Sequence, residues 1–319
     1  MRKPSLLRQL LSPIYLLPII FGCFVIFLHL HYHAAFKFNA WSIMFASLAA
    51  VIVFLINLFS FLRSLFSNQP KNIRGLFSDT TEMLAEWLPF IILIFFYENL
   101  HHVTYILRPD TFDHVLMKID EAIFGFQPAF WIEKISNPYL VDYMALFYAL
   151  WLFFPLTLQM ILWFRKMRTE FHAIMIAQLI CYYIGFIGYI TVPAIGPKYV
   201  LIDQYQKPEV EGVYLQHPTR YLIDKMEAVN RDCFPSLHTA ITGIGLFFAF
   251  RVRKKIPRGK LILGIFLIST LSVWASTIFL REHWVVDVLA GIVLSYFSYQ
   301  VSPRIIAFWE NRDRLTNSA

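Results

Sequence analysis

The segment Phe171–Val192 reads FHAIMIAQLICYYIGFIGYITV and contains no Asp, Glu, Lys or Arg. A helix needs roughly 20 mostly apolar residues to cross the hydrocarbon core of a bilayer. This segment therefore predicts a transmembrane helix, and similar runs give eight candidate spans along the chain. The candidates are Pro13–Leu30, Ala40–Leu62, Leu84–Tyr105, Val141–Phe164, Phe171–Val192, Phe234–Phe250, Leu261–Leu280 and Trp284–Val301. We expect an all-α polytopic bundle of about eight transmembrane helices.

The composition supports a membrane protein and argues against a soluble domain and against a nucleic-acid-binding protein. Hydrophobic residues make up 58% of the 319 residues and charged residues only 15%, whereas soluble domains carry about 25% charged residues. The net charge of +7 does not indicate nucleic-acid binding, because the basic residues lie in short loops between apolar runs and not in one patch.

The cysteines and the N-terminus give no strong indication of a disulfide framework, a zinc site or a cleaved signal peptide. Cys23 and Cys181 lie in apolar runs and Cys233 lies in a loop, a pattern that predicts neither a disulfide framework nor a zinc site. The start, MRKPSLLRQL, resembles a signal peptide. The apolar run from Pro13 is longer than such a signal usually has and lacks a convincing cleavage site, so we interpret it as the first span.

Basic residues in the loops predict the orientation, because cytoplasmic loops are enriched in Lys and Arg. With a cytoplasmic N-terminus, the richest inner cluster lies between the sixth and seventh spans. It comprises Arg251, Arg253, Lys254, Lys255, Arg258 and Lys260. The outer loops are richer in acids, and eight spans leave both termini in the cytoplasm.

Two predicted outer loops are long. Residues 106–140 contain helical patterns at about 110–138, which fit helices at the membrane surface and equally well packed loop helices. Residues 193–233 are polar and lead into the first of two motifs.

The first motif is Arg-Asp-Cys-Phe-Pro-Ser-Leu-His-Thr at residues 231–239. We expect Pro235 to begin a helix, which places Ser236 and His238 in the first turn. Unpaired N–H groups and the helix dipole make such a turn a natural phosphate site. A helix cap beside an interfacial histidine explains the same residues equally well.

The second motif is Arg-Glu-His-Trp-Val-Val-Asp at residues 281–287. His283 and Asp287 share a helix face at i and i+4. The carboxylate can hold one imidazole nitrogen as N–H and leave the other as a nucleophile. An ionisable residue within a span is a functional candidate, although the pair could also only pin helix ends.

Both motifs fall on the predicted outer face, which favours one shared site. Lys198 in Val-Pro-Ala-Ile-Gly-Pro-Lys-Tyr (192–199), Arg281 and Arg231 could neutralise phosphate there. A solvated loop lysine is an equally good interpretation of Lys198. Glu98, near the outer end of the third span, is a candidate for headgroup binding or for a helix–helix hydrogen bond.

Phe-Pro-Ser-Leu-His at 234–238, followed by Arg-x-His-Trp-x-x-Asp at 281–287, resembles the type 2 phosphatidic acid phosphatase superfamily. The closest likeness is to its inositol phosphorylceramide synthase-like and sphingomyelin synthase-like branch. The resemblance covers about 84–302 as a six-helix catalytic domain. Residues 1–83 would then be a two-helix membrane extension, and 303–319 a cytoplasmic tail.

The resemblance implies roles for the motif residues. His283 would be the nucleophile, Asp287 its orienting partner, His238 the general acid and Ser236 a phosphate contact, with no metal or organic cofactor. The Lys-x6-Arg-Pro motif of the phosphatases is absent, and Lys198 is its only counterpart. The phosphatases carry an arginine at the position of Thr277, whereas this chain has Arg281. The sphingolipid-synthase-like branch shares both departures.

We therefore expect a lipid phosphotransferase that moves an inositol-phosphate-like headgroup between membrane lipids through a phospho-histidine. Lipid phosphate hydrolysis, of phosphatidate or isoprenoid phosphate, is the alternative within the superfamily. A lipid transporter or flippase is the alternative from another class, and it is disfavoured because transport sites lie near the bilayer midplane. The expected partners are membrane lipids and no nucleic acid. The site would face away from the cytoplasm, in the plasma membrane of a bacterium or a Golgi/ER-type membrane of a eukaryote.

Overall fold

Helices dominate the computed structural model, which describes residues 11–36, 40–66, 72–207, 210–226 and 231–318. In these ranges no strand forms, and one isolated parallel bridge joins Ala194 to Asp232. The predicted all-α class is confirmed. In chain order the helices are α2 Pro13–His31, α3 Ala40–Ser64, α4 Ile73–Leu107, α5 Asp113–Phe124, α6 Pro128–Ile135, α7 Pro138–Ala149, α8 Phe153–Phe164, α9 Arg168–Thr191, α10 Pro197–Val200, η1 Ile202–Gln204, α11 Gln216–Met226, α12 Leu237–Val252, α13 Gly259–Phe279 and α14 Val285–Ser318.

Five of the described helices are long and apolar enough to cross a membrane, namely α2, α4, α9, α13 and α14. The pair α7 and α8 makes a sixth if its 42° bend belongs to one span. The other two predicted spans coincide with shorter apolar helices, which are α12 with 16 residues and the segment Ala50–Ser64 of α3. A polytopic membrane bundle is thus confirmed, with five to six full-length spans where eight were predicted.

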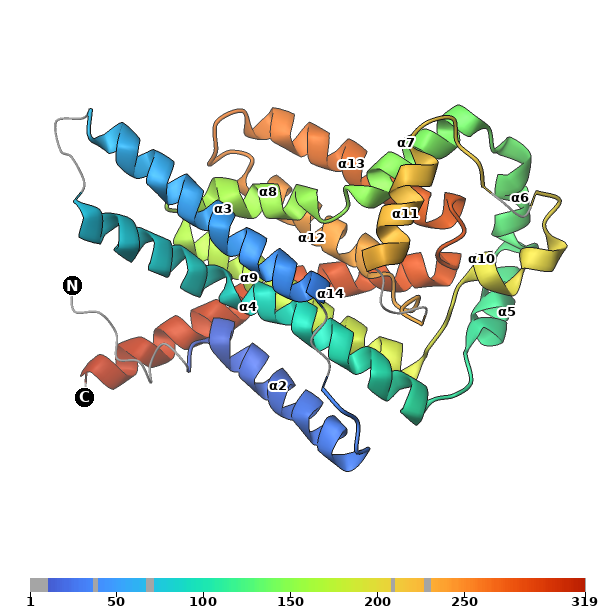
Figure 1. Cartoon of the computed structure of the whole chain (residues 1–319), viewed down its shortest axis with the longest axis horizontal. Coiled ribbons are helices and arrows are strands. Elements are labelled where there is room, and N and C mark those ends of the chain that lie inside the picture. Colours follow the sequence, from blue (N-terminus) through green and yellow to red (C-terminus); the bar gives the residue numbers. More distant parts are fainter. Residues whose placement is uncertain (1–10, 37–39, 67–71, 208–209, 227–230, 319) are drawn as a thin grey trace.

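Helix α9, which contains the opening segment of the sequence analysis, forms the centre of the bundle. Its apolar stretch is 83% buried, against 33–39% for the other full-length spans. It packs against α2, α4, α8, α12 and α14 (Figure 1). Two glycines allow the approach of α12, because a Cβ at Gly188 would lie 2.4 Å from Pro235 and one at Gly185 would lie 2.6 Å from Leu237.

Several boundaries differ from the sequence prediction. Helix α4 begins at Ile73 and not at Leu84, so the predicted domain boundary between residues 83 and 84 falls inside this helix. Pro235 does not begin α12, because Ser236 has an extended backbone and caps a helix that starts at Leu237. The predicted fourth span, Val141–Phe164, is broken between α7 and α8. The last helix begins at Val285 and continues through Pro303 to Ser318, beyond the predicted end at Val301.

The predicted surface helices are α5 and α6, which lie with α10 at one end of the molecule, whereas the last turns of α14 lie at the opposite end (Figure 1). Helix α5 carries two buried carboxylates, Asp113 and Asp120, two turns apart on one face. Asp113 accepts hydrogen bonds from the backbone N–H groups of Ile195 and Gly196 and from the indole N–H of Trp284, at 2.8–2.9 Å in its closest contacts. Asp120 accepts the N–H groups of Val285 and Val286 at 2.7 and 2.8 Å.

Two further carboxylates hold the second outer loop. Asp142 of α7 accepts four consecutive backbone N–H groups, those of residues 213–216, at 2.7–3.0 Å. This anion lies at the start of α11, where helix N–H groups point outward. Glu133 of α6 accepts the N–H groups of Gln206 and Lys207. The acids of the 110–142 segment therefore organise the loops at this end of the bundle.

Replacing Asp120 should loosen the start of α14. Asp120→Ala leaves the N–H groups of Val285 and Val286 without their acceptor, and an unpaired buried donor costs about 1–3 kcal/mol. We expect a lower unfolding temperature in detergent, measured by intrinsic fluorescence. The control is Glu121→Ala, which removes an exposed carboxylate from the same helix and should leave the unfolding temperature unchanged.

The pH dependence provides a second readout for Asp120. Burial raises the pKa of this carboxyl to about 6, above about 3.9 in an unfolded chain. A raised pKa means that the folded state binds the proton more tightly. This stabilisation is complete below about pH 4 and is lost as the pH rises through about 6. Wild type should therefore lose stability relative to Asp120→Asn over that interval. Parallel pH curves for the two proteins would contradict this assignment.

Candidate active site

Backbone contacts between distant loops bring the two motifs together. The bridge between Ala194 and Asp232 is extended by a hydrogen bond from the Cys233 N–H to the Ala194 carbonyl at 3.3 Å. The Ser236 N–H then donates to the Asp287 carbonyl at 3.1 Å. A Cβ at Gly291 would lie 2.5 Å from the Ser236 carbonyl. The backbones of α14 and of the start of α12 therefore lie in direct contact at this glycine.

Ser236 and His238 lie at the start of α12, as predicted. Ser236 is the N-cap, and its hydroxyl oxygen accepts from the Thr239 N–H at 3.4 Å. This is the capping role in which serine is favoured. His238 is the second residue of the helix. Its ring stacks on Tyr148 and lies against Trp151, with centroids 4.4 and 4.6 Å away.

His283 and Asp287 meet in a different way from the predicted shared helix face. His283 lies in the loop two residues before α14 begins. Asp287, in the first turn, reaches back to accept the Trp284 N–H at 2.8 Å, as acidic residues do in a capping box. The His283 Nδ1 then lies 3.6 Å from the Asp287 Oδ2. The carboxylate therefore orients both the loop and the imidazole.

The two histidines face each other across the site. The Nε2 of His283 lies 3.5 Å from the Nδ1 of His238, and both rings meet edge to face. Because the Nδ1 of His283 faces the Asp287 carboxylate, this nitrogen is the natural place for the ring proton. The Nε2 is then an unprotonated lone pair directed at His238, which is the state that a nucleophile needs.

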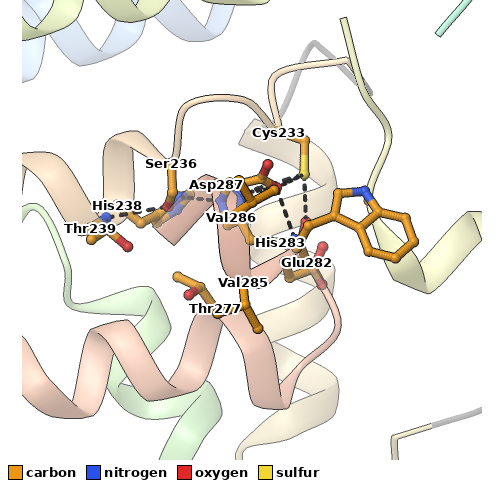
Figure 2. Close-up of polar contacts among 12 residues, drawn as sticks. Cys233, Ser236, His238, Thr239, Thr277, Glu282, His283, Val285, Val286 and Asp287 are labelled. Carbon is orange, nitrogen blue, oxygen red and sulfur yellow. Dashed lines mark hydrogen bonds and ion pairs between the residues drawn. The ribbon is translucent and has the colours of Figure 1, made fainter. Parts of the chain in front are cut away.

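Cys233 completes this cluster, and its role was not predicted. Its sulfur lies 2.8 Å from the Asp287 Oδ2 and 3.5 Å from the His283 Nδ1 (Figure 2). It also contacts the Glu282 carbonyl at 3.3 Å. Burial raises the pKa of the thiol well above its ordinary value, so the group is a neutral S–H that donates to the carboxylate. No local sequence signal distinguishes this cysteine from a structural one.

Two cations meet beside His283 on the side chain of Glu282. Lys198 lies 3.3 Å from the Glu282 carboxylate, and Arg220 of α11 binds the same oxygen. Arg220 also donates to the Tyr199 hydroxyl at 3.0 Å. Lys198 thus lies next to the second motif, as the sequence suggested. Arg220 and Glu282 were not singled out, because only tertiary contacts bring α11 to this loop.

The other predicted phosphate ligands have different partners. The buried Arg281 donates to the Lys207 carbonyl at 2.9 Å and to Glu133 at 3.2 Å, and its guanidinium lies 3.5 Å from the Tyr205 ring centroid. Arg231 donates to the Arg108 carbonyl at the end of α4 and lies over Tyr105. For both residues phosphate contact stays a prediction.

Glu98 lies in α4, one residue after Tyr97, whose hydroxyl donates to Asp232 at 2.6 Å. The structure thus brings the neighbour of Glu98, through Asp232, to the loop that carries Cys233. Burial raises the pKa of Asp232. Headgroup binding by Glu98 stays a prediction.

Gly196 explains how the Lys198 loop can lie so close to the second motif. Its φ is +86°, in the region that favours glycine, and a Cβ would lie 2.5 Å from the Glu282 carbonyl. Two residues later, the Lys198 N–H donates to the Arg281 carbonyl at 2.8 Å. The two segments therefore pack backbone to backbone.

The sequence shows no spacing typical of a metal site, but the structure brings three possible ligand atoms together. Ligand atoms of Cys233, His283 and Asp287 all lie within 4.8 Å of one another. Sequence spacing could not reveal this cluster, because 50 residues separate Cys233 from His283 and folding alone brings them together.

The comparisons with known proteins identify the family of this chain. The family model described as the PAP2 superfamily matches residues 114–301, which is more than half of the chain. The chain therefore belongs to the PAP2 superfamily, whose members are lipid phosphatases and phosphotransferases. This confirms the resemblance stated from the two motifs and supports an integral membrane enzyme that acts on lipids.

The chain also resembles one curated protein. The chain is similar to the phosphoinositol dihydroceramide synthase of Bacteroides thetaiotaomicron, with 24% identity over 167 residues, which cover 47% of this chain and 51% of the relative. The chain thus matches about half the length of this relative. No solved structure matches the chain significantly.

Proposed function

We propose that the protein is a lipid phosphotransferase that carries an inositol-phosphate-like headgroup from one membrane lipid to another through a phospho-histidine. One observation carries the proposal. The His283 Nε2 faces His238 at 3.5 Å, while the Asp287 carboxylate lies behind the Nδ1 at 3.6 Å. Nucleophile, proton donor and orienting carboxylate thus follow one another in space.

The first half-reaction uses both histidines. The Nε2 lone pair of His283 attacks phosphorus, and the bond from phosphorus to the leaving alcohol oxygen breaks. His238 gives its proton to that oxygen, as a general acid does. Substrate must separate the two rings for this step, and catalytic contacts often tighten only once substrate is bound. The His283 imidazolium that forms is stabilised by Asp287.

The second half-reaction reverses these roles. The hydroxyl oxygen of the acceptor lipid attacks phosphorus, His238 takes its proton, and the bond between phosphorus and the His283 nitrogen breaks. Lys198 and Arg220 bring positively charged groups next to His283, where both bind the carboxylate of Glu282. Positive charge placed where phosphoryl oxygens become more negative stabilises such transition states.

Two observations favour transfer over hydrolysis. A relative with the printed name of a synthase aligns with 47% of this chain, and the first motif of the phosphatases is absent from the sequence. The proposed donor is a phosphoinositol lipid, and the proposed acceptor is a ceramide-type lipid with a free hydroxyl.

The purified chain should therefore move label from a phosphoinositol lipid to dihydroceramide. His283→Ala should lower turnover by on the order of 10³-fold or more, and His238→Ala by about 10²–10⁴-fold. The control is His217→Ala, which removes an exposed histidine from α11 and should retain full activity. Products are separated by thin-layer chromatography.

Near-normal turnover of His283→Ala would refute the relay. Release of labelled inositol phosphate or inorganic phosphate, with no labelled ceramide, would make the protein a lipid phosphatase instead. Labelled phosphatidate and phosphocholine lipids, tested in parallel, identify the donor class.

We propose further that the site faces away from the cytoplasm, because the most basic loop follows α12 at the opposite end of the molecule (Figure 1). In a Cys23→Ala background, Tyr214→Cys should react with an impermeant maleimide in sealed right-side-out vesicles. Lys254→Cys should react only after permeabilisation. Both native side chains are exposed, so access depends on sidedness, and the reverse pattern would contradict the orientation.

A further inference from the structure

The cluster of Cys233, His283 and Asp287 has the composition of a transition-metal site. It offers one thiol sulfur, one imidazole nitrogen and one carboxylate oxygen, and all three side chains are buried. Sulfur and nitrogen ligands select zinc over magnesium or calcium, which prefer oxygen. Asp287 Oδ1 is also buried without a hydrogen-bond partner among the described residues. An orphaned carboxylate oxygen adds a second reason for a cation.

The distances suit a tetrahedral ion. Typical zinc–ligand lengths of about 2.0–2.3 Å place neighbouring ligand atoms of a tetrahedral site about 3.3–3.8 Å apart. The sulfur lies 3.5 Å from the His283 Nδ1, which lies 3.6 Å from the Asp287 Oδ2. The sulfur–oxygen edge is 2.8 Å. This edge lengthens when the thiol proton that now joins the two atoms is replaced by a cation.

The charges also balance. A thiolate and a carboxylate together neutralise a dication, and the imidazole remains neutral. In the described parts of the chain, no Lys or Arg forms an ion pair with Asp287, because the nearby Lys198 and Arg220 pair with Glu282. The Glu282 carbonyl oxygen, 3.3 Å from the same sulfur, or a water molecule can complete the coordination.

We propose that Cys233, His283 and Asp287 form an inhibitory zinc site. Zinc binding displaces the thiol proton to solvent. The ion also takes the Nδ1 lone pair of His283, so the ring proton moves to Nε2, because a neutral imidazole carries its one proton on the other nitrogen. The Nε2 then has no free lone pair with which to attack phosphorus. The site itself is independent of the proposed function, whereas its inhibitory effect rests on it.

Binding is measured first, without turnover. The purified full chain in detergent is dialysed against Zn²⁺ and its metal content is determined. Wild type and Cys23→Ala should each bind about one equivalent, and Cys233→Ala should bind at least about 10-fold more weakly. With Co²⁺ as probe, a thiolate-to-metal charge-transfer band should appear in wild type and Cys23→Ala and be absent from Cys233→Ala. Equal binding and an equal band in Cys233→Ala would overturn the site.

Inhibition is measured next on the same preparations. Zn²⁺ should suppress lipid turnover by wild type and Cys23→Ala, a chelator should restore it, and Mg²⁺ should have no effect. Cysteine-dependent binding without loss of turnover would overturn the inhibitory role and leave the site intact. A protein that binds zinc at Cys233 but transfers no headgroup would instead count against the proposed function alone.

Discussion

The carboxylate of Asp287 is the constraint on which the site depends. It is fully buried, and a carboxylate in such a place needs hydrogen-bond donors. The Trp284 N–H, the Cys233 thiol and the His283 imidazole all converge on its Oδ2. These contacts to one oxygen fix the conformation of the loop before α14 and the position of Cys233 in the 231–235 loop. They also favour the His283 tautomer that carries its proton on Nδ1. The hydrogen bonds that the buried Asp287 carboxylate requires therefore also place the groups of the candidate active site.

The carboxylates of the 110–142 segment perform a similar task at the outer end of the bundle. Asp113 and Asp120 hold Trp284 and the start of α14, while Asp142 holds the start of α11. Each acid satisfies N–H groups that would otherwise lie unpaired next to the site. Arg220 reaches Glu282 from α11, so the anchor at Asp142 also positions a cation beside His283. Helices α5 and α7 therefore support the structure of the site.

The sequence predicted what depends on local pattern and on motif. Apolar runs marked every long helix, and the two motifs marked His238 and His283, which lie together although 45 residues separate them. Contacts that only folding creates escaped prediction. The position of Cys233 in the sequence does not indicate its contacts with His283 and Asp287. The side chain of Arg281, a residue with a φ of +63°, binds Glu133. The predicted helix start at Pro235 was wrong because Ser236 is the N-cap and α12 begins at Leu237. The helix propensities of neighbouring residues do not decide between two starts so close together.

The central claim is that His283 carries the phosphate, and trapping the intermediate tests it most directly. The purified chain is mixed with phosphorus-labelled phosphoinositol lipid in the absence of acceptor, quenched in alkali within one turnover, and digested for peptide mapping. The account predicts label on His283 that survives base, is lost in acid, and is absent from His283→Ala. Product formation within one turnover of added acceptor, with no label on His283 at any time, would contradict the account and indicate direct transfer between two bound lipids.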